Sequence, residues 1–157
     1  MAQFQFPLYR PGDRDFGERR RAIGNERGDD PWPKLLQQML RARGYDAQVI
    51  NAGISGNDVG QELSRLDSAV GRGTRLVILD TAFSNSANRG VNIAATVDEI
   101  SARLRARGIK LIVIPNMHAW ADYQVRPDGT HITEQGHAAV AAHSLPLVIA
   151  ALAQAGD

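Results

Sequence analysis

Two uninterrupted apolar runs constrain the fold of this chain more than any other feature of its sequence. Residues 76–79 read Leu-Val-Ile-Leu and residues 111–114 read Leu-Ile-Val-Ile. A run without polar residues is typical of a parallel strand that is covered on both faces. Between the runs, apolar residues recur at helical spacing: Ile93, Val97, Ile100 and Leu104. The pattern predicts a strand, a crossover helix and a second parallel strand.

The rest of the chain continues the alternation of strands and helices. Residues 3–9 and 47–51 are predicted as strands. Residues 31–43, with an N-cap at Asp30 and a closing Gly44, residues 59–70 and residues 133–153 are predicted as helices. Pro146 should bend or split the last helix. We therefore expect one α/β domain over residues 1–157, with a parallel sheet of four or five strands in the order 2-1-3-4 and helices on both faces.

Composition narrows the classes of function. The formal net charge is only +1, which gives no field strong enough to indicate a nucleic-acid or membrane partner. There is no cysteine, which excludes disulfides and zinc–thiolate sites, and no metal-ligand spacing is seen. No apolar run approaches the roughly 18 residues of a membrane span, and the first residues lack the features of a signal peptide. We expect a cytoplasmic protein of unknown oligomeric state.

Asp128 and His131 are the first candidates for chemistry. They stand three residues apart in Pro127-Asp128-Gly129-Thr130-His131, just before the last predicted helix. An Asp at this distance can hold one tautomer of the imidazole and leave the other ring nitrogen as a general base. The alternative is structural, because Pro-Asp-Gly is a common turn sequence and Thr133 can cap the helix.

Two further loops follow predicted strands and carry polar residues. Residues 51–57 read Asn-Ala-Gly-Ile-Ser-Gly-Asn, and residues 80–90 read Asp-Thr-Ala-Phe-Ser-Asn-Ser-Ala-Asn-Arg-Gly. Because the carboxyl ends of parallel strands meet at one edge of a sheet, we expect both loops to border one cleft. The first loop is equally well explained as a glycine-rich turn with Asn57 or Asp58 as a helix cap.

Taken in order, these three segments resemble the second, third and last sequence blocks of the GDSL/SGNH hydrolase family, which includes lysophospholipase-, thioesterase- and arylesterase-like enzymes. The resemblance runs from Trp32 to Leu152. It implies a three-layer flavodoxin-like fold and a cofactor-free, metal-free esterase of small-molecule esters. It also implies roles for four residues: His131 as base, Asp128 as its partner, and Gly56 and Asn85 as oxyanion donors. Asn85 is preferred to Asn88 because it keeps the family spacing to the Arg-Gly pair.

The first block departs from the family, because the serine nucleophile is missing. Gly12-Asp13 fits the family's Gly-Asp-Ser, but Arg14 stands where the serine should be, and family spacing counted back from Trp32 points to Glu18. The first serine of the chain is Ser55, which we consider as a substitute nucleophile. An arginine stays protonated and cannot accept an acyl group.

Three interpretations follow from this departure. The chain is an impaired hydrolase in which His131 activates water, or a catalytically silent protein that binds an acyl or anionic ligand. Alternatively, residues 10–27 were altered by engineering or by a reading-frame error. The arginines between Arg10 and Arg27 either form a solvated loop or bind a phosphate or carboxylate. His118 is interpreted as a loop residue with a substrate contact as the alternative, and His137 and His143 as structural.

Overall fold

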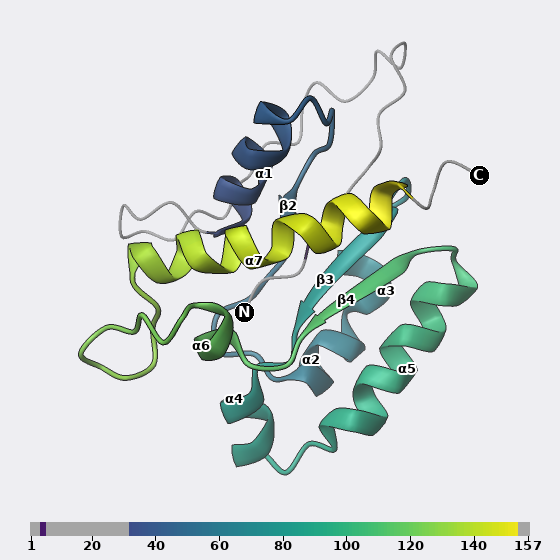
Figure 1. The fold of residues 1–157 in the computed structure, drawn as a ribbon. Helices are drawn as coiled ribbons and strands as arrows, with labels where there is room; N and C mark the ends of the chain where they lie inside the picture. Colours follow the sequence, from purple (N-terminus) through teal and green to yellow (C-terminus); the bar gives the residue numbers. More distant parts are fainter. Residues whose placement is uncertain (1–3, 6–31, 154–157) are drawn as a thin grey trace.

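A parallel pair of strands forms the centre of the protein in the computed structural model, which describes Phe4–Gln5 and residues 32–153 (Figure 1). The pair consists of β3 (Leu76–Asp80) and β4 (Lys110–Ile114), in a register that sets Leu76 opposite Lys110 and Asp80 opposite Ile114. Every residue of β3 is buried. The two strands predicted from the apolar runs are therefore confirmed.

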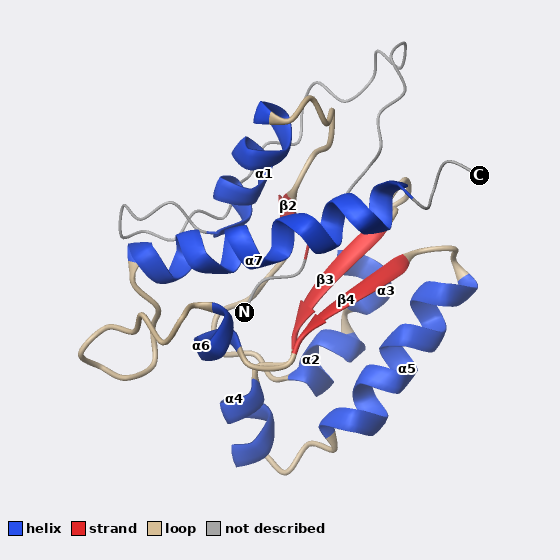
Figure 2. Ribbon diagram, viewed as in Figure 1, coloured by secondary structure: helices blue, strands red, loops and turns tan. Residues whose placement is uncertain are grey.

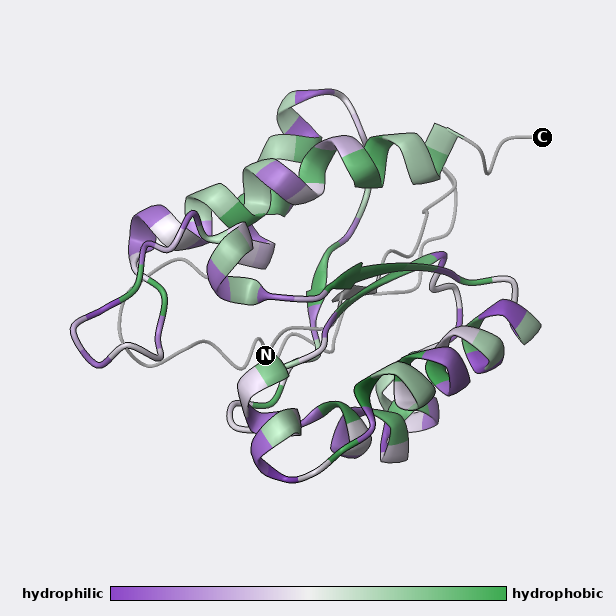
Figure 3. Cartoon of the chain, turned by 60° about the horizontal axis from the view of Figure 1, so that its bottom comes forward, coloured by the Kyte–Doolittle hydropathy of each residue, from purple (hydrophilic) through white to green (hydrophobic). Residues whose placement is uncertain are grey.

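Helices cover both faces of this pair. On one face, α1 (Trp32–Ala42) and α7 (Glu134–Ala153) share a buried cluster with Leu76 and Ile78 (Figure 2). On the other face, α2 (Val59–Ser64), α3 (Leu66–Ala69) and α5 (Ile93–Ala106) pack with Val77 and Leu79. Successive residues of a strand point to opposite faces, so a run that is apolar at every position supplies both clusters. Figure 3 shows the apolar strands between the two groups of helices. The α/β class is confirmed.

The predicted parallel sheet of four or five strands is wrong for the first two strands. β1 (Phe4–Gln5) pairs antiparallel with β2 (Ile50–Asn51), and β3 and β4 are the parallel strands among the described residues. Both residues of β2 are exposed, so the burial on both faces that accompanies parallel pairing is lacking there. β1 does lie against β3. No strand pairing joins β1 to β3 among the described residues, so a single sheet in the predicted order 2-1-3-4 is not seen.

The predicted helices are present, with differences in their number and bounds. α1 buries Leu36 and Leu40 and is closed by a turn at Gly44, whose φ of +81° suits a residue without a side chain. The expected cap at Asp30 lies outside the described residues. The helix predicted over residues 59–70 is divided at Arg65 into α2 and α3. Two short helices, α4 (Phe83–Asn88) and α6 (Met117–Trp120), lie in segments that were expected to be loops.

Pro146 was predicted to bend or split the last helix; α7 runs as one helix through Pro146, so a split is wrong. Proline removes the hydrogen bond to the carbonyl four residues earlier, which belongs to Ala142. Ala142 is exposed, so water can satisfy that carbonyl. By length and composition alone α7 could also cross a membrane, which is weak evidence. Here it packs along α1 and buries four core residues on one side: Val140, Ala141, Leu145 and Val148.

Candidate functional site

The candidate site lies at the carboxyl ends of β3 and β4. α4 follows β3, while α6 and the loop over residues 121–133 follow β4, and Figure 1 shows all three at the end of the strands to which the arrowheads point. Ligands of parallel α/β sheets bind beyond this edge. The segments that carry Asp128, His131 and Asn85 therefore start from the edge where binding is expected.

Asp128 and His131 form a tight local pair in the loop before α7. One carboxylate oxygen, Oδ1, accepts hydrogen bonds from the backbone N–H groups of Thr130 and His131, both at 2.9 Å. The other, Oδ2, lies 2.9 Å from His131 Nδ1. These bonds, led by the backbone N–H of His131, hold the pKa of Asp128 well below its usual range. The sequence offered a turn and an Asp–His contact as alternatives, and the structure contains both the turn and the contact.

This geometry fixes how the imidazole can act. The ionised carboxylate can only accept, so Nδ1 carries the proton of the contact and Nε2 is left to take one from elsewhere. The side chains of His131 and Asp128 are 58% and 45% exposed, so a ligand or water can reach the ring. An Asp–His pair with this tautomer can act as a general base.

His118 approaches the same loop from α6. Its Nε2 lies 3.0 Å from the carbonyl oxygen of Thr130, and because a carbonyl only accepts, His118 is the donor. Asp80, at the end of β3, is buried, and its burial raises the pKa of its carboxyl group, partly offset by the hydrogen bond from Ala82 N and the charge of His118. Asp80 was not among the site residues predicted from the sequence. The feature of the sequence that could have indicated it is a charged residue directly after the apolar run over residues 76–79.

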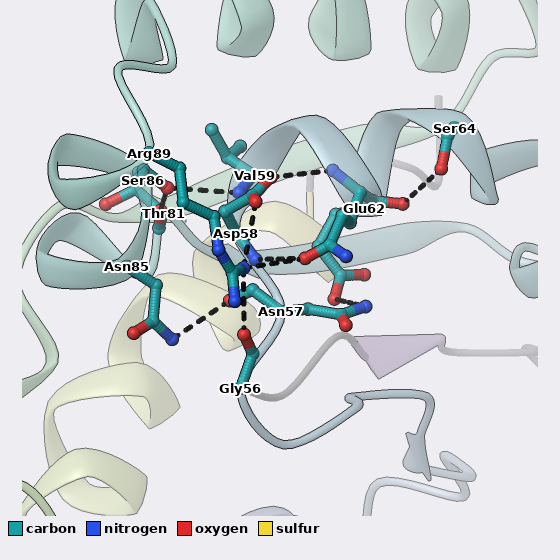
Figure 4. Close-up of polar contacts among 11 residues, drawn as sticks. Gly56, Asn57, Asp58, Val59, Glu62, Ser64, Thr81, Asn85, Ser86 and Arg89 are labelled. Atoms are coloured by element: carbon teal, nitrogen blue, oxygen red, sulfur yellow. Dashed lines mark hydrogen bonds and ion pairs between the residues drawn. The ribbon is translucent and has the colours of Figure 1, made fainter.

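Gly56 and Asn85 lie where the turn after β2 meets α4 (Figure 4). Asn85 Nδ2 donates to the carbonyl oxygen of Asn57 at 3.2 Å. Ser86 adds a buried link, because its Oγ donates to Thr81 O at 2.7 Å and accepts from Val59 N at 3.0 Å. The structure therefore brings Asn85 beside the residue that follows Gly56.

The turn continues into α2 through a capping box. From the sequence, Asn57 or Asp58 was expected only as a simple helix cap. Asp58 Oδ1 accepts from Gln61 N at 2.9 Å, and Gln61 Oε1 accepts from Asp58 N at 3.1 Å. The sequence signal was Asp58 followed three residues later by Gln61. The backbone hydrogen bond from Gln61 contributes most to lowering the pKa of Asp58.

The candidate residues thus form two groups, one of Asp128, His131 and His118 and one of Gly56 and Asn85. No hydrogen bond among residues 32–153 joins the groups directly. Thr81 Oγ1 donates to Pro115 O at 3.0 Å and so links the ends of β3 and β4.

Ser55 is exposed in the Gly56 turn. Arg14, Glu18 and the segment from Arg10 to Arg27 lie outside the described residues, which contain no group of three or more side chains that could hold a metal ion.

Comparison with known proteins gives one partial similarity. No family model and no solved structure matches the chain. Over 86 residues the chain is 28% identical to Esterase TesA from Pseudomonas aeruginosa, a match that covers 53% of this chain. The match spans 43% of the length of that relative. A weak, partial likeness to an esterase agrees with the resemblance to GDSL/SGNH hydrolases and suggests that family.

Proposed function

We propose that this chain is an SGNH/GDSL-type hydrolase that acts on carboxylic esters of small molecules, built as a single three-layer flavodoxin-like domain over residues 1–157. One observation carries the proposal: Asp128 Oδ2 lies 2.9 Å from His131 Nδ1 in the loop between β4 and α7. The partial likeness to an esterase supports the same class of reaction.

In the proposed reaction, His131 Nε2 takes a proton from a water molecule while the oxygen of that water adds to the ester carbonyl carbon. Asp128 stabilises the imidazolium that forms. The backbone N–H of Gly56 and the side-chain amide of Asn85 donate to the oxyanion. The bond from the carbonyl carbon to the alcohol oxygen then breaks, and His131 returns its proton to the leaving alcohol. No cofactor or metal is required.

The proposed enzyme is slow, because water replaces a serine as the attacking group. A serine beside a base forms an acyl-enzyme and divides one difficult step into two. Neither Arg14 nor Glu18 supplies such a nucleophile. Enzymes without their nucleophile retain rates on the order of 10³-fold over water from binding and the oxyanion site.

The second candidate function is a catalytically silent protein that binds an acyl or anionic ligand at the same edge. The observation in its favour is the sequence itself, which places Arg14 where the family has its nucleophile and gathers arginines between Arg10 and Arg27. Guanidinium groups bind carboxylate and phosphate through two parallel hydrogen bonds.

Hydrolysis of short-chain p-nitrophenyl esters tests the first proposal. We expect slow turnover by the natural chain and faster turnover by Arg14→Ser. His131→Ala should lower the remaining rate by about 10²-fold, the contribution of a positioned general base. His143→Ala is the matched control, because His143 also contacts a carboxylate, Asp122, at 3.0 Å and is similarly exposed at 52%. Its loss should leave the rate unchanged.

Two results would contradict this account of the site. If His131→Ala and His143→Ala are equally active, the Asp128–His131 pair is only a turn. If Ser55→Ala abolishes turnover, or a fluorophosphonate labels Ser55, the nucleophile is Ser55. Absence of turnover in both the natural chain and Arg14→Ser favours the silent binding protein instead.

A further inference from the structure

Arg89, the residue that follows α4, reaches across to the Gly56 turn. Its Nη1 lies 3.1 Å from Gly56 O, 2.9 Å from Asp58 Oδ2 and 2.8 Å from Gln61 Oε1 (Figure 4). All three acceptors belong to the turn or to the start of α2. The Asp58 carboxylate is 7% exposed, so this ion pair is partly shielded from water. One guanidinium therefore links the end of α4 to the turn.

The contact with Gly56 O holds a glycine of the turn that has a left-handed backbone conformation. Gly56 has a φ of +80°, and a Cβ built there would have no neighbour within 4 Å, so side-chain packing does not hold this residue. The peptide group between Gly56 and Asn57 is instead held at both ends. Its carbonyl accepts from Arg89, and its N–H donates to Ile54 O at 3.2 Å. Fixing this peptide limits the rotation of the glycine that precedes it.

Asn57 is held from the opposite side by a buried acid. Asn57 Nδ2 donates to Glu62 Oε1 at 3.1 Å, and Glu62 is itself paired with Arg65. The Glu62 side chain has no exposed surface, and this burial raises its pKa. Because the carbonyl of Asn57 also accepts from Asn85 Nδ2, the position of Asn57 sets where the Asn85 amide lies.

We infer that Arg89 is a positioning residue, which holds the N–H of Gly56 and the amide of Asn85 at one fixed separation so that both can donate to the same oxyanion. This inference rests on the proposed function. Arg89 affects the reaction only by holding the Gly56 turn, because its guanidinium forms an ion pair with Asp58. Donors that are fixed in advance stabilise the transition state because they need no reorganisation during the reaction.

Arg89 is a better test than Asp58, since Asp58 also caps α2 and its loss would weaken the helix. Arg89→Ala and Arg89→Lys are compared with Arg103→Ala. Arg103 is a suitable control because it makes an ion pair with Glu99 at 2.7 Å and is 46% exposed, against 50% for Arg89. Each change is made in the natural chain or in Arg14→Ser, whichever hydrolyses p-nitrophenyl ester.

We expect Arg89→Ala to lower kcat by about tenfold or more with little change in KM, the pattern of an interaction made in the transition state. Arg89→Lys should recover part of the loss, because an ammonium keeps the charge but reaches fewer acceptors at once. Hydrogen exchange of the Asn57 amide should accelerate about tenfold in Arg89→Ala as the turn loosens. Arg103→Ala should change neither quantity.

The two readouts separate failure of the inference from failure of the proposed function. If exchange accelerates while kcat of an active background is unchanged, the turn does not serve the oxyanion and the inference is wrong, although the hydrolase stands. If Arg89→Ala raises only KM, Arg89 contributes to substrate binding instead. If neither background hydrolyses ester, the proposed function fails first, and the role of Arg89 in catalysis fails with it.

Discussion

Ser86→Ala removes a buried hydroxyl that links three elements of the fold. Ser86 has no exposed surface. Its Oγ donates to Thr81 O, just beyond β3, at 2.7 Å and accepts from the N–H of Val59, the first residue of α2, at 3.0 Å. Val59 and Thr81 are also buried, so water cannot easily replace the lost partner.

The magnitude follows from the two groups that lose their partner. A buried donor or acceptor left unsatisfied costs about 1–3 kcal/mol. The Thr81 carbonyl has two lone pairs and suffers less than the Val59 N–H, which has one hydrogen to donate. We therefore expect Ser86→Ala to lower the free energy of unfolding by about 2–4 kcal/mol. For a chain of this size, that corresponds to a fall in Tm of roughly 6–12 °C.

Urea denaturation followed by circular dichroism measures this loss, with Ser144→Ala as the control. Ser144 is also fully buried, but its Oγ bonds only to Val140 O, one turn earlier in the same helix, at 2.7 Å. Such bonds stabilise a helix little, so Ser144→Ala should change stability by less than about 1 kcal/mol. Equal effects of the two substitutions would refute the argument that cross-linking, rather than burial of a serine, decides the cost.

Two other substitutions should raise the stability of the protein, whereas Ser86→Ala lowers it. Ala82 adopts a left-handed conformation with a φ of +45° between β3 and α4, so Ala82→Gly should relieve strain and raise the free energy of unfolding by about 1 kcal/mol in the same urea assay. Asp80 has its pKa raised from 3.8 by burial, so the stability of the natural chain falls as pH rises from 3.8 through that raised pKa. Asp80→Asn keeps the oxygen that accepts from Ala82 N and loses the buried charge. Its stability relative to the natural chain should therefore improve as pH rises from 3.8 through the raised pKa of Asp80, and a constant difference would contradict the assignment.

The elements that the sequence predicted well are those whose signal is contained in a few neighbouring residues. β3 and β4 are runs of apolar residues that satisfy both faces of a strand by themselves. Strands were also predicted over residues 3–9 and 47–51, but β1 and β2 pair over two residues, too few to indicate from sequence whether the pairing is parallel or antiparallel. The division of one predicted helix at Arg65 also escaped detection, since its apolar spacing continues across the break.

The same distinction applies to the candidate site. Asp128 and His131 are three residues apart, so a local turn brings them together, and the sequence could predict the pair. Arg89 and Gly56 are 33 residues apart, and Ser86 and Val59 are 27 apart. Their contacts depend on how α4 and α2 pack beside β3. Sequence reasoning without a structure had no means of assigning partners to Ser86 or Arg89.

The exposure of a side chain decides whether its substitution tests the reaction or the stability of the fold. His131 is 58% exposed, and the backbone N–H with which it closes the Asp128 turn remains when the side chain is removed. An exposed pair of this kind contributes little to folding. His131→Ala should therefore leave the fold intact, so any loss of ester hydrolysis in that variant reflects proton transfer. Ser86→Ala weakens the fold itself, and a loss of activity there carries no information about the reaction until stability has been measured.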